Sequence, residues 1–403
     1  MTTIGGAWGP APGQMRAPVG VAVDQHGSLL IADRDNHRIL KYAAGVPDWA
    51  QVNVNGFGDR DNGIVLSLGG FGGSLYAGTD NKNGAQLWRM NSAGAWSSLT
   101  TSGFGDRSNG GINTLLEFNS QLYAGTWNWN AATNASNGGQ VWRSPDGVTW
   151  QRVVPNGFGD PTNGEVFRFV RFGNHLYAST WSYTGAHGGE IWRSASGNTG
   201  DWSRVVTNGF GDAGNFVVGS MAVLTNYLYA GTFNESTGGE IWRTNDGTTW
   251  QQVNLDGFGD PDTWAISSMA AFDGYLYASV RNSLQVWRCR RCNGTDWQPV
   301  VQDGFGTPAT NKANALEVVG ETLYLVVGNY STGMEVWRTQ DGFEWSQIGF
   351  AGFGDSNNRA PYWDNSVLAF DDRLWIGTWN SANGGELWKY LPLRVYMPVV
   401  RSG

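Results

Sequence analysis

The sequence predicts an all-β fold, a β-propeller made of four-stranded antiparallel blades. Three observations lead to this fold class: a glycine-rich motif recurs along the chain, its copies are almost evenly spaced, and no segment carries a sustained helical period. The copies lie 47 to 54 residues apart, and a fixed period in this range is typical of solenoids and propellers. The motif is Gly-Phe-Gly-Asp at 56–59, 103–106, 157–160, 209–212, 257–260 and 352–355, with Gly-Phe-Gly-Thr at 304–307 as an altered copy.

Each repeat contains the residues of four short strands. A short apolar run such as 217–223 comes first, and a strand of the Leu-Tyr-Ala-Gly-Thr type follows, as at 228–232. The third strand reads Glu/Gln-aliphatic-Trp-Arg/Lys, and the fourth reads Trp-x-x-Val, as at 150–153. β-Branched and aromatic residues favour strands, and Gly, Asn and Asp favour the turns between them. Four antiparallel strands per repeat are typical of a propeller blade.

The two ends of the chain complete the predicted count of blades. The segment before the first motif divides into four predicted strands, the last at 49–54, and residues 396–400 read like the fourth strand at 297–301. We therefore predict a single propeller domain over 1–403 with eight blades; seven is the alternative if the first segment is an appendage. The predicted blades are approximately 12–55, 56–102, 103–156, 157–208, 209–256, 257–303, 304–351 and 352–403.

Two segments resemble known propeller repeats. Residues 12–39, with PVGVAVD at 18–24 and IADRDNHRI at 31–39, closely resemble an NHL repeat, which is itself a propeller blade. The predicted hairpins SPDGVTW at 144–150 and TNDGTTW at 244–250 resemble the Asp-box, or BNR, repeat of sialidases and related propellers, one residue shorter than its usual form. In that family the box is a folding element away from the active site. The resemblance therefore implies a fold and not an activity.

Composition argues against several classes of function. The chain has 403 residues, with 26 Lys and Arg against 34 Asp and Glu, which gives a net charge of −8. An acidic chain without basic runs is poorly suited to bind nucleic acid or anionic lipid. The apolar runs are far shorter than the roughly 20 residues of a membrane helix. We therefore expect neither nucleic-acid binding nor membrane insertion.

The N-terminus and the two cysteines bear on the location of the protein. The chain opens with polar, glycine-rich residues rather than with a secretory signal, which leaves cytosolic and exported locations both open. Cys289 and Cys292 lie in a predicted hairpin between third and fourth strands. A redox site of the thioredoxin type needs a helix N-terminus, so a local disulfide or a free dithiol is the better interpretation. An extracellular or cell-surface location is expected from the function proposed below.

Aromatic residues recur where the second strand of a repeat ends. In an up-and-down blade, the turns after strands two and four share one face. Water-facing loops normally avoid Trp, so its recurrence there predicts a repeated ligand pocket, although the same side chains could instead fill the space between blades. The predicted ligand-binding residues in these loops are Trp127, Asn128, Trp129, Trp181, Tyr183, Phe233, Asn234, Trp379 and Asn380.

Two further sets of polar residues recur. Glu190, Glu240 and Glu386 precede the third-strand Trp by two residues, and they are candidates for ligand contact, with a structural hydrogen bond as the alternative. An Asp-x-x-Asn spacing follows Phe-Gly in several repeats, as at 59–62 and 212–215. Such a pair closes a turn on its own backbone, and a ring of these oxygens is also a conceivable Ca²⁺ site. We favour the turn and predict no cofactor.

The predicted function is binding rather than catalysis. An indole face packs against the C–H face of a pyranose, while Asn and Glu bond its hydroxyls, so the predicted partner is a glycan or glycoconjugate. We assign no catalytic residues, because the four His are scattered and the unrepeated residues, such as Arg281, Arg359, Tyr362 and Asp364, form no recognisable constellation. The alternatives are a carbohydrate hydrolase or lyase with central carboxylates, and a protein-interaction scaffold.

Overall fold

The chain divides into two compact units, where the sequence predicted a single domain. They comprise Met1–Ala50 with Tyr390–Gly403, and Gln51–Lys389. The computed structural model describes residues 15–23, 29–42, 49–183, 187–281, 283–302, 304–306, 311–361 and 364–391.

The first unit contains a three-stranded antiparallel sheet with strand order β1-β2-β3. A 3₁₀ turn, η1 (Arg34–Asn36), joins its second and third strands. The carboxylate of Asp33 is buried beside this turn and accepts bonds from the Arg16 N–H at 2.6 Å and from Arg38 Nε at 2.9 Å. Burial raises the pKa of Asp33, but these hydrogen bonds and one from Asn36 outweigh it and hold the pKa below its ordinary value. The strands are β1 (Pro18–Val23), β2 (Leu29–Asp33) and β3 (Arg38–Tyr42).

The second unit consists of antiparallel groups of four strands, as the repeats predict. In each group the chain runs from strand to adjacent strand, so that sequence neighbours are hydrogen-bonded neighbours. The groups are β5 (Val65–Phe71), β6 (Ser74–Thr79), β7 (Leu87–Met90) and β8 (Trp96–Thr100); β9 (Asn109–Phe118), β10 (Gln121–Asn130), β12 (Val141–Ser144) and β13 (Gln151–Arg152); β14 (Asn163–Phe172), β15 (His175–Ser182), β16 (Ile191–Ser194) and β17 (Ser203–Val206); β18 (Val217–Leu224), β19 (Tyr227–Phe233), β20 (Ile241–Thr244) and β21 (Gln251–Gln252). The others are β22 (Ile266–Phe272), β23 (Tyr275–Val280), β24 (Gln285–Cys289) and β25 (Gln298–Val301); β26 (Asn311–Val319), β27 (Thr322–Asn329), β28 (Glu335–Thr339) and β29 (Ser346–Ile348); β30 (Val367–Phe370), β31 (Arg373–Gly377), β32 (Leu387–Tyr390) and β4 (Trp49–Gln51). The boundary between the two units passes through β4 and the end of β32. A short additional strand, β11 (Ala135–Ser136), pairs with the end of β10.

The prediction that 12–55 forms a four-stranded blade is wrong. The predicted fourth strand at 49–54 instead supplies β4, which completes the sheet of β30, β31 and β32. The reason lies in the free edge of β32, whose backbone groups need partners. The Val52 N–H donates to the Leu387 carbonyl at 2.9 Å, and the Leu387 N–H donates to Asn53 Oδ1 at 2.7 Å. Residues 396–400, the predicted last strand, lie outside the described residues.

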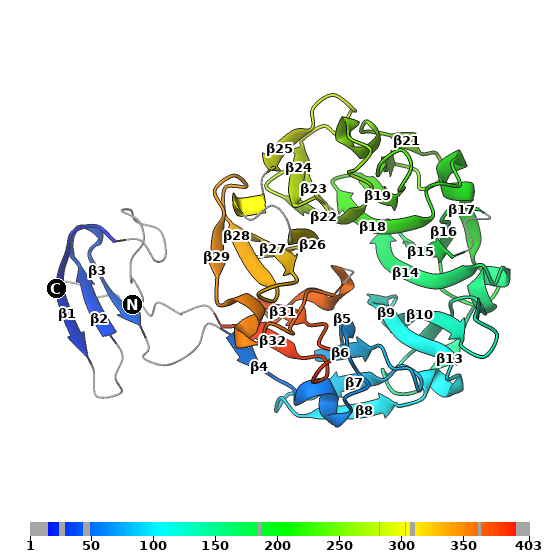
Figure 1. Ribbon diagram of the computed structural model, residues 1–403, viewed down its shortest axis with the longest axis horizontal. Helices are drawn as coiled ribbons and strands as arrows, with labels where there is room; N and C mark the ends of the chain where they lie inside the picture. The colour runs from blue at the N-terminus through cyan, green and yellow to red at the C-terminus, as the bar shows by residue number, and fades with distance from the viewer. Residues whose placement is uncertain are drawn as a thin grey trace. The chain divides into compact units, whose positions relative to one another are not determined.

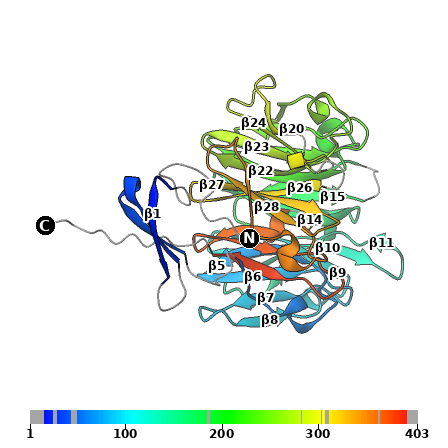
Figure 2. The same cartoon turned by 60° about the vertical axis from the view of Figure 1, so that its left-hand side comes forward.

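The sheets of the second unit are arranged as sectors around a common centre (Figures 1 and 2). The first strands β5, β9, β14, β18, β22 and β26 lie toward this centre (Figure 1). Each first strand contacts the first strand of the next sheet, and β30 contacts β5. The apolar core therefore lies between successive sheets, where their side chains meet.

The Gly-Phe-Gly-Asp motif forms a 3₁₀ turn ahead of each first strand. Its Phe takes a positive φ, 57° at Phe158, which is costly for a side chain of this size. The ring of Phe158 lies stacked 4.8 Å from that of Trp192 and edge-on to Trp202 at 5.6 Å. This aromatic packing compensates the backbone strain and explains why the turn and the third-strand Trp recur together.

Tyrosines of the second strands reach from one sheet to the next. Tyr76 is fully buried, and a Cβ added to Gly147 in the hairpin of the following sheet would lie 2.0 Å from its hydroxyl oxygen. Tyr123 has the same relation to Gly197. The hairpin glycines therefore recur because any side chain there would collide with the neighbouring tyrosine.

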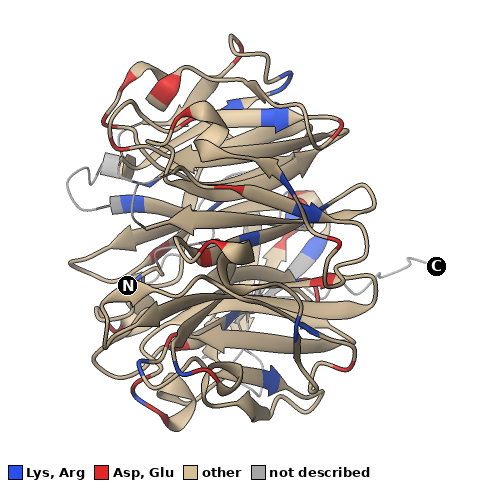
Figure 3. Ribbon diagram, turned by 90° about the vertical axis from the view of Figure 1, so that its right-hand side faces the viewer, with Lys and Arg blue, Asp and Glu red and all other residues tan. Residues whose placement is uncertain are grey.

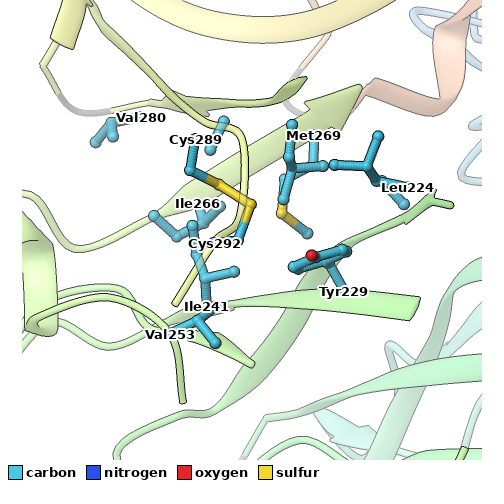
Figure 4. Packing of buried hydrophobic residues seen from close by; sticks show 12 residues of the cluster. Leu224, Tyr229, Ile241, Val253, Ile266, Met269, Val280, Cys289 and Cys292 are labelled. Carbon is cyan, nitrogen blue, oxygen red and sulfur yellow. A yellow bond between two sulfur atoms is a disulfide. The ribbon is translucent and has the colours of Figure 1, made fainter. Parts of the chain in front are cut away.

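Cys289 and Cys292 form a disulfide. It is buried in the core between two sheets and packs with Ile241, Ile266 and Met269 (Figure 4). The carboxylate of Asp296 accepts hydrogen bonds from the backbone of the hairpin that holds the two cysteines. The disulfide thus occupies the place of the usual hairpin turn and is a local structural clip.

The strand order predicts opposite effects for two proline changes. Ala230 is fully buried in β19, which has β18 and β20 as neighbours, whereas Pro299 lies in the edge strand β25. Ala230→Pro removes a ladder bond and is expected to lower the free energy of unfolding by about 3 kcal/mol or more. Pro299→Val is expected to change it little or to raise it slightly. Urea denaturation measures both, and equal losses would contradict this strand order.

Candidate binding site

A buried asparagine ties together the loops on one face of each repeat. In the fourth four-stranded group, Asn215 Nδ2 donates to the Gly209 carbonyl and to Glu240 Oε2, both at 2.8 Å. Its Oδ1 accepts from Thr232 Oγ1 at 2.9 Å and from Asn234 Nδ2 at 3.2 Å. One side chain therefore links the Gly-Phe-Gly-Asp turn, the second strand and the third strand. Asn62, Asn109, Asn163 and Asn358 occupy the same position in their repeats.

Three of the predicted ligand-binding residues belong to this network. Asn128, Asn234 and Asn380 are buried, and each donates through Nδ2 to the aspartate of its own turn. The distances are 2.8 Å to Asp106, 3.0 Å to Asp212 and 3.1 Å to Asp355. Because the donors are taken up by protein carboxylates, these amides hold the loops in place, and ligand contact does not fit them.

The same applies to Glu190, Glu240 and Glu386. All three are buried, and each accepts the indole N–H of the Trp two residues later, at 2.7 to 2.9 Å. The repeat requires an acceptor oxygen here rather than a charge, which explains why glutamine also occurs. Where it does, as at Gln86, its Nε2 donates to the turn aspartate Asp59 at 2.8 Å.

The turn aspartates are engaged with protein donors. Asp212, for example, accepts from the Gly214 N–H at 2.8 Å as well as from Asn234. Across the described residues, no three His, Cys, Asp or Glu side chains are grouped so as to hold a metal ion. The geometry favours the turn over a ring of Ca²⁺ ligands, and the absence of a cofactor stays a prediction.

The aromatic residues of the third group line an open cavity of 510 Å³. The rings of Trp181 and Tyr183 lie stacked with centroids 4.7 Å apart, and Phe216 completes the aromatic wall. Glu235 and Ser236, both exposed, contribute polar groups from the next repeat. The cavity thus combines an aromatic wall with carboxylate and hydroxyl groups.

The other predicted aromatic residues are placed differently. Trp127 is half-buried and lies against Gly111, where an added Cβ would come within 1.8 Å of its indole nitrogen. Trp129 contacts Tyr183 with ring centroids 5.4 Å apart. Phe233 is buried among aromatic rings that include Phe167, and ligand contact does not fit it. Trp379, the last of the set, is half-buried and pairs with Arg359 through two backbone hydrogen bonds of 2.9 Å.

A second cavity, of 150 Å³, lies beside Trp127 and holds two carboxyl groups. Glu165 accepts from Asn113 Nδ2 at 2.8 Å and from the Tyr183 hydroxyl. Asp80 accepts from the Ile64 N–H at 2.8 Å. Burial raises the pKa of each carboxyl to about 7. Burial and the neighbouring Glu165 also raise the pKa of Tyr183.

Sequence reasoning missed Asp80, Asn113 and Glu165. The available signal was departure from the repeat: Asp80 follows Thr79 where other repeats have an aromatic residue, as at Trp127. Of the unrepeated residues noted in the sequence, Arg281 is buried and Arg359 is half-buried. Tyr362 and the side chain of Asp364 lie outside the described residues.

Comparison with known proteins supports a propeller-like repeat fold. Residues 15–42 match the NHL repeat family. No curated protein sequence matches this chain. YCF48 from Cyanidioschyzon merolae is similar in structure with a TM-score of 0.58 at 13% identity, over 86% of this chain and 99% of that one. Virginiamycin B lyase from Staphylococcus aureus has a TM-score of 0.55 at 10% identity, over 85% of this chain and 98% of that one.

A polysaccharide lyase of family PL25, an ulvan lyase, is also similar. Its TM-score is 0.52 at 12% identity, over 84% of this chain and 94% of that one. At such identities the likeness concerns the fold alone. The chain is thus an all-β protein with propeller-like repeats and an NHL repeat near its N-terminus.

Two surface properties complete the description. Lys and Arg are interspersed with Asp and Glu in the view of Figure 3, and no basic face is seen there. Among the described residues, no helix has the length and apolar character needed to cross a bilayer.

The buried carboxyl of Glu165 makes stability depend on pH. Its pKa is about 7 in the folded protein against an ordinary value of 4.5, so the unfolded chain releases this proton first as the pH rises. The contribution of Glu165 to stability is therefore full below pH 4.5 and falls by about 3 kcal/mol up to pH 7. Glu165→Gln is expected to flatten the dependence of the unfolding free energy on pH in this window.

Urea denaturation at several pH values measures this effect. Glu321→Gln, a change at an exposed hairpin position, is the matched control and should keep the wild-type dependence. A Glu165→Gln variant with an undiminished pH dependence would show that this carboxyl titrates normally.

Proposed function

We propose that the protein binds carbohydrate in the aromatic cavity formed by Trp181, Tyr183 and Phe216. The observation that carries this proposal is the cavity itself, which combines an aromatic wall with exposed Glu235 and Ser236. A sugar ring packs its C–H face on such a wall while its hydroxyls bond the polar groups. The cavity volume of 510 Å³ is within the range of ordinary ligand pockets.

We further propose that the second unit is a closed propeller of seven blades. This is supported by the contact of β30 with β5 and by the Val65 N–H, which donates to the Thr378 carbonyl at 3.0 Å. The hairpins at 144–150 and 244–250 support the Asp-box resemblance, because Asp146 and Asp246 each accept two backbone N–H groups of their own turn. Such a rigid disc would present its loops on one face as a fixed surface.

A saccharide bound to one of the similar proteins supports a glycan ligand, and the disulfide supports a location outside the cell. The ulvan lyase structure contains a bound saccharide, and another YCF48 structure, with a TM-score of 0.56 at 13% identity, contains a peptide named D1. Propeller-like folds therefore serve both kinds of ligand, and the aromatic cavity favours the first. The Cys289–Cys292 disulfide favours an oxidising, extracellular location.

Glycan-array binding tests the proposal. Trp181→Ala is expected to weaken binding about 5- to 150-fold, because an aromatic stacking platform contributes about 1–3 kcal/mol. Glu235→Ala should weaken binding without lowering the melting temperature, since Glu235 is exposed. Glu321→Ala, another exposed glutamate, is the control and should bind like the wild type. A wild-type protein that binds no glycan, or a Trp181→Ala variant that binds normally, would refute the proposal.

A second candidate function is cleavage of the bound glycan. It is favoured by Glu165 and Asp80, which line one cavity and whose pKa values are both raised to about 7 by burial. Near pH 7 one carboxyl of such a pair can be protonated and donate its proton to a glycosidic oxygen, while the other is ionised and activates the attacking water. Release of reducing ends from a bound glycan, lost in Glu165→Gln, would support hydrolysis. Binding without any product would leave the protein a lectin-like module.

A further inference from the structure

Two cations share one aromatic ring near the start of β26. Lys312 Nζ lies 5.4 Å and the Arg359 guanidinium 5.2 Å from the centroid of the Tyr330 ring. The same guanidinium lies 5.6 Å from the centre of the Trp379 ring. All four side chains are half-buried, so each keeps part of its surface exposed to solvent.

Neither cation has an acidic partner among the residues that the structure describes. This contrasts with Lys82, which pairs with Asp61 at 2.9 Å, and with Arg204, which pairs with Glu190 at 2.6 Å. Two like charges on one ring repel each other unless an anion lies between them. Since neither cation is ion-paired within the described part of the chain, an oxyanion from outside could lie between them.

The two cations occupy positions in their repeats that are equivalent to that of Glu165 in its repeat. Lys312, near the beginning of its sheet, is paired with Gly328 of the second strand. Glu165 and Trp181 are the equivalent pair in their own sheet. Arg359 pairs in the same way with Trp379. The equivalent positions of the other repeats carry uncharged or acidic residues. Lys312 and Arg359 are therefore exceptions to the repeat pattern, like Asp80 and Glu165.

We propose that Lys312 and Arg359, on the rings of Tyr330 and Trp379, bind the carboxylate or sulfate group of an acidic sugar. The Arg359 guanidinium lies near two ring faces, and its planar set of N–H groups is suited to bidentate bonds to an oxyanion. The lysine adds a second charge, and the rings supply apolar surface for the sugar C–H groups. This inference rests on the proposed carbohydrate binding and narrows its ligand to anionic glycans.

The experiment compares charged and uncharged forms of the same saccharides. The probes are oligogalacturonate and its methyl ester, and a sulfated galactan oligosaccharide and its desulfated form, with affinities measured by calorimetry. The wild type is expected to bind at least one charged probe at least 10-fold more tightly than its uncharged counterpart. The charged probe that binds identifies the group as carboxylate or sulfate. The affinity of the wild type for that probe should fall as NaCl is raised from 50 to 500 mM. This measurement requires no variant.

Variants locate the charge preference. The double variant Lys312→Met with Arg359→Met is expected to lose that preference, and Arg359→Lys to retain part of it. Lys82→Met removes an ion-paired lysine and should leave all affinities unchanged. Tighter or equal binding of the uncharged probes, or a double variant that keeps its preference for charge, would overturn the inference while leaving carbohydrate binding intact. Failure to bind any of the four probes or any arrayed glycan would overturn both.

Discussion

The fold and the loops of the candidate site depend on one repeated interaction, made by the buried asparagine that follows five of the Gly-Phe-Gly-Asp turns. Asn215 alone connects a turn carbonyl, the third-strand Glu240 and the second-strand Thr232 through hydrogen bonds of 2.8 to 2.9 Å. A buried amide costs free energy unless its donors and acceptor are all paired, and here they are. The loops that end the second strands, and with them the aromatic cavity, are held in place by this pairing.

Most of the framework residues differ from the groups with distinctive chemistry, although Trp181 both recurs and lines the aromatic cavity. Residues that recur in the same place, such as Asn128, Glu190 and the stacked pair of Phe158 and Trp192, form the framework. Groups with distinctive chemistry stand where the repeat is broken, as at Glu165 and Lys312. Such exceptions cost stability locally, because a buried carboxyl or an uncompensated cation is unfavourable. A fold built from many similar sheets tolerates these costs, since each pair of neighbouring sheets encloses its own apolar core.

Much of the architecture follows from the sequence, because the strand pattern and the turns repeat with it. The four-stranded groups and the order of their strands could be predicted. The place of β4 could not, because Val52 takes its partner at Leu387, more than three hundred residues away, and nothing local encodes that pairing. Recurrence alone led us to expect ligand contact at Asn234 and Glu240, and their hydrogen bonds to Asp212 and Trp242 could not be foreseen, because these form only once the turn and strands are assembled.

The most direct test of this account is the stability of Asn215→Ala against Asn245→Ala. Asn245 is exposed in a hairpin, so its loss should change the free energy of unfolding by less than about 0.5 kcal/mol. Loss of Asn215 leaves the buried Glu240 and Thr232 without their shared partner and should lower that free energy by about 2–4 kcal/mol. It should also speed amide hydrogen exchange in the turn at 208–211. Equal stability of the two variants would contradict the claim that the buried asparagines hold the binding face together.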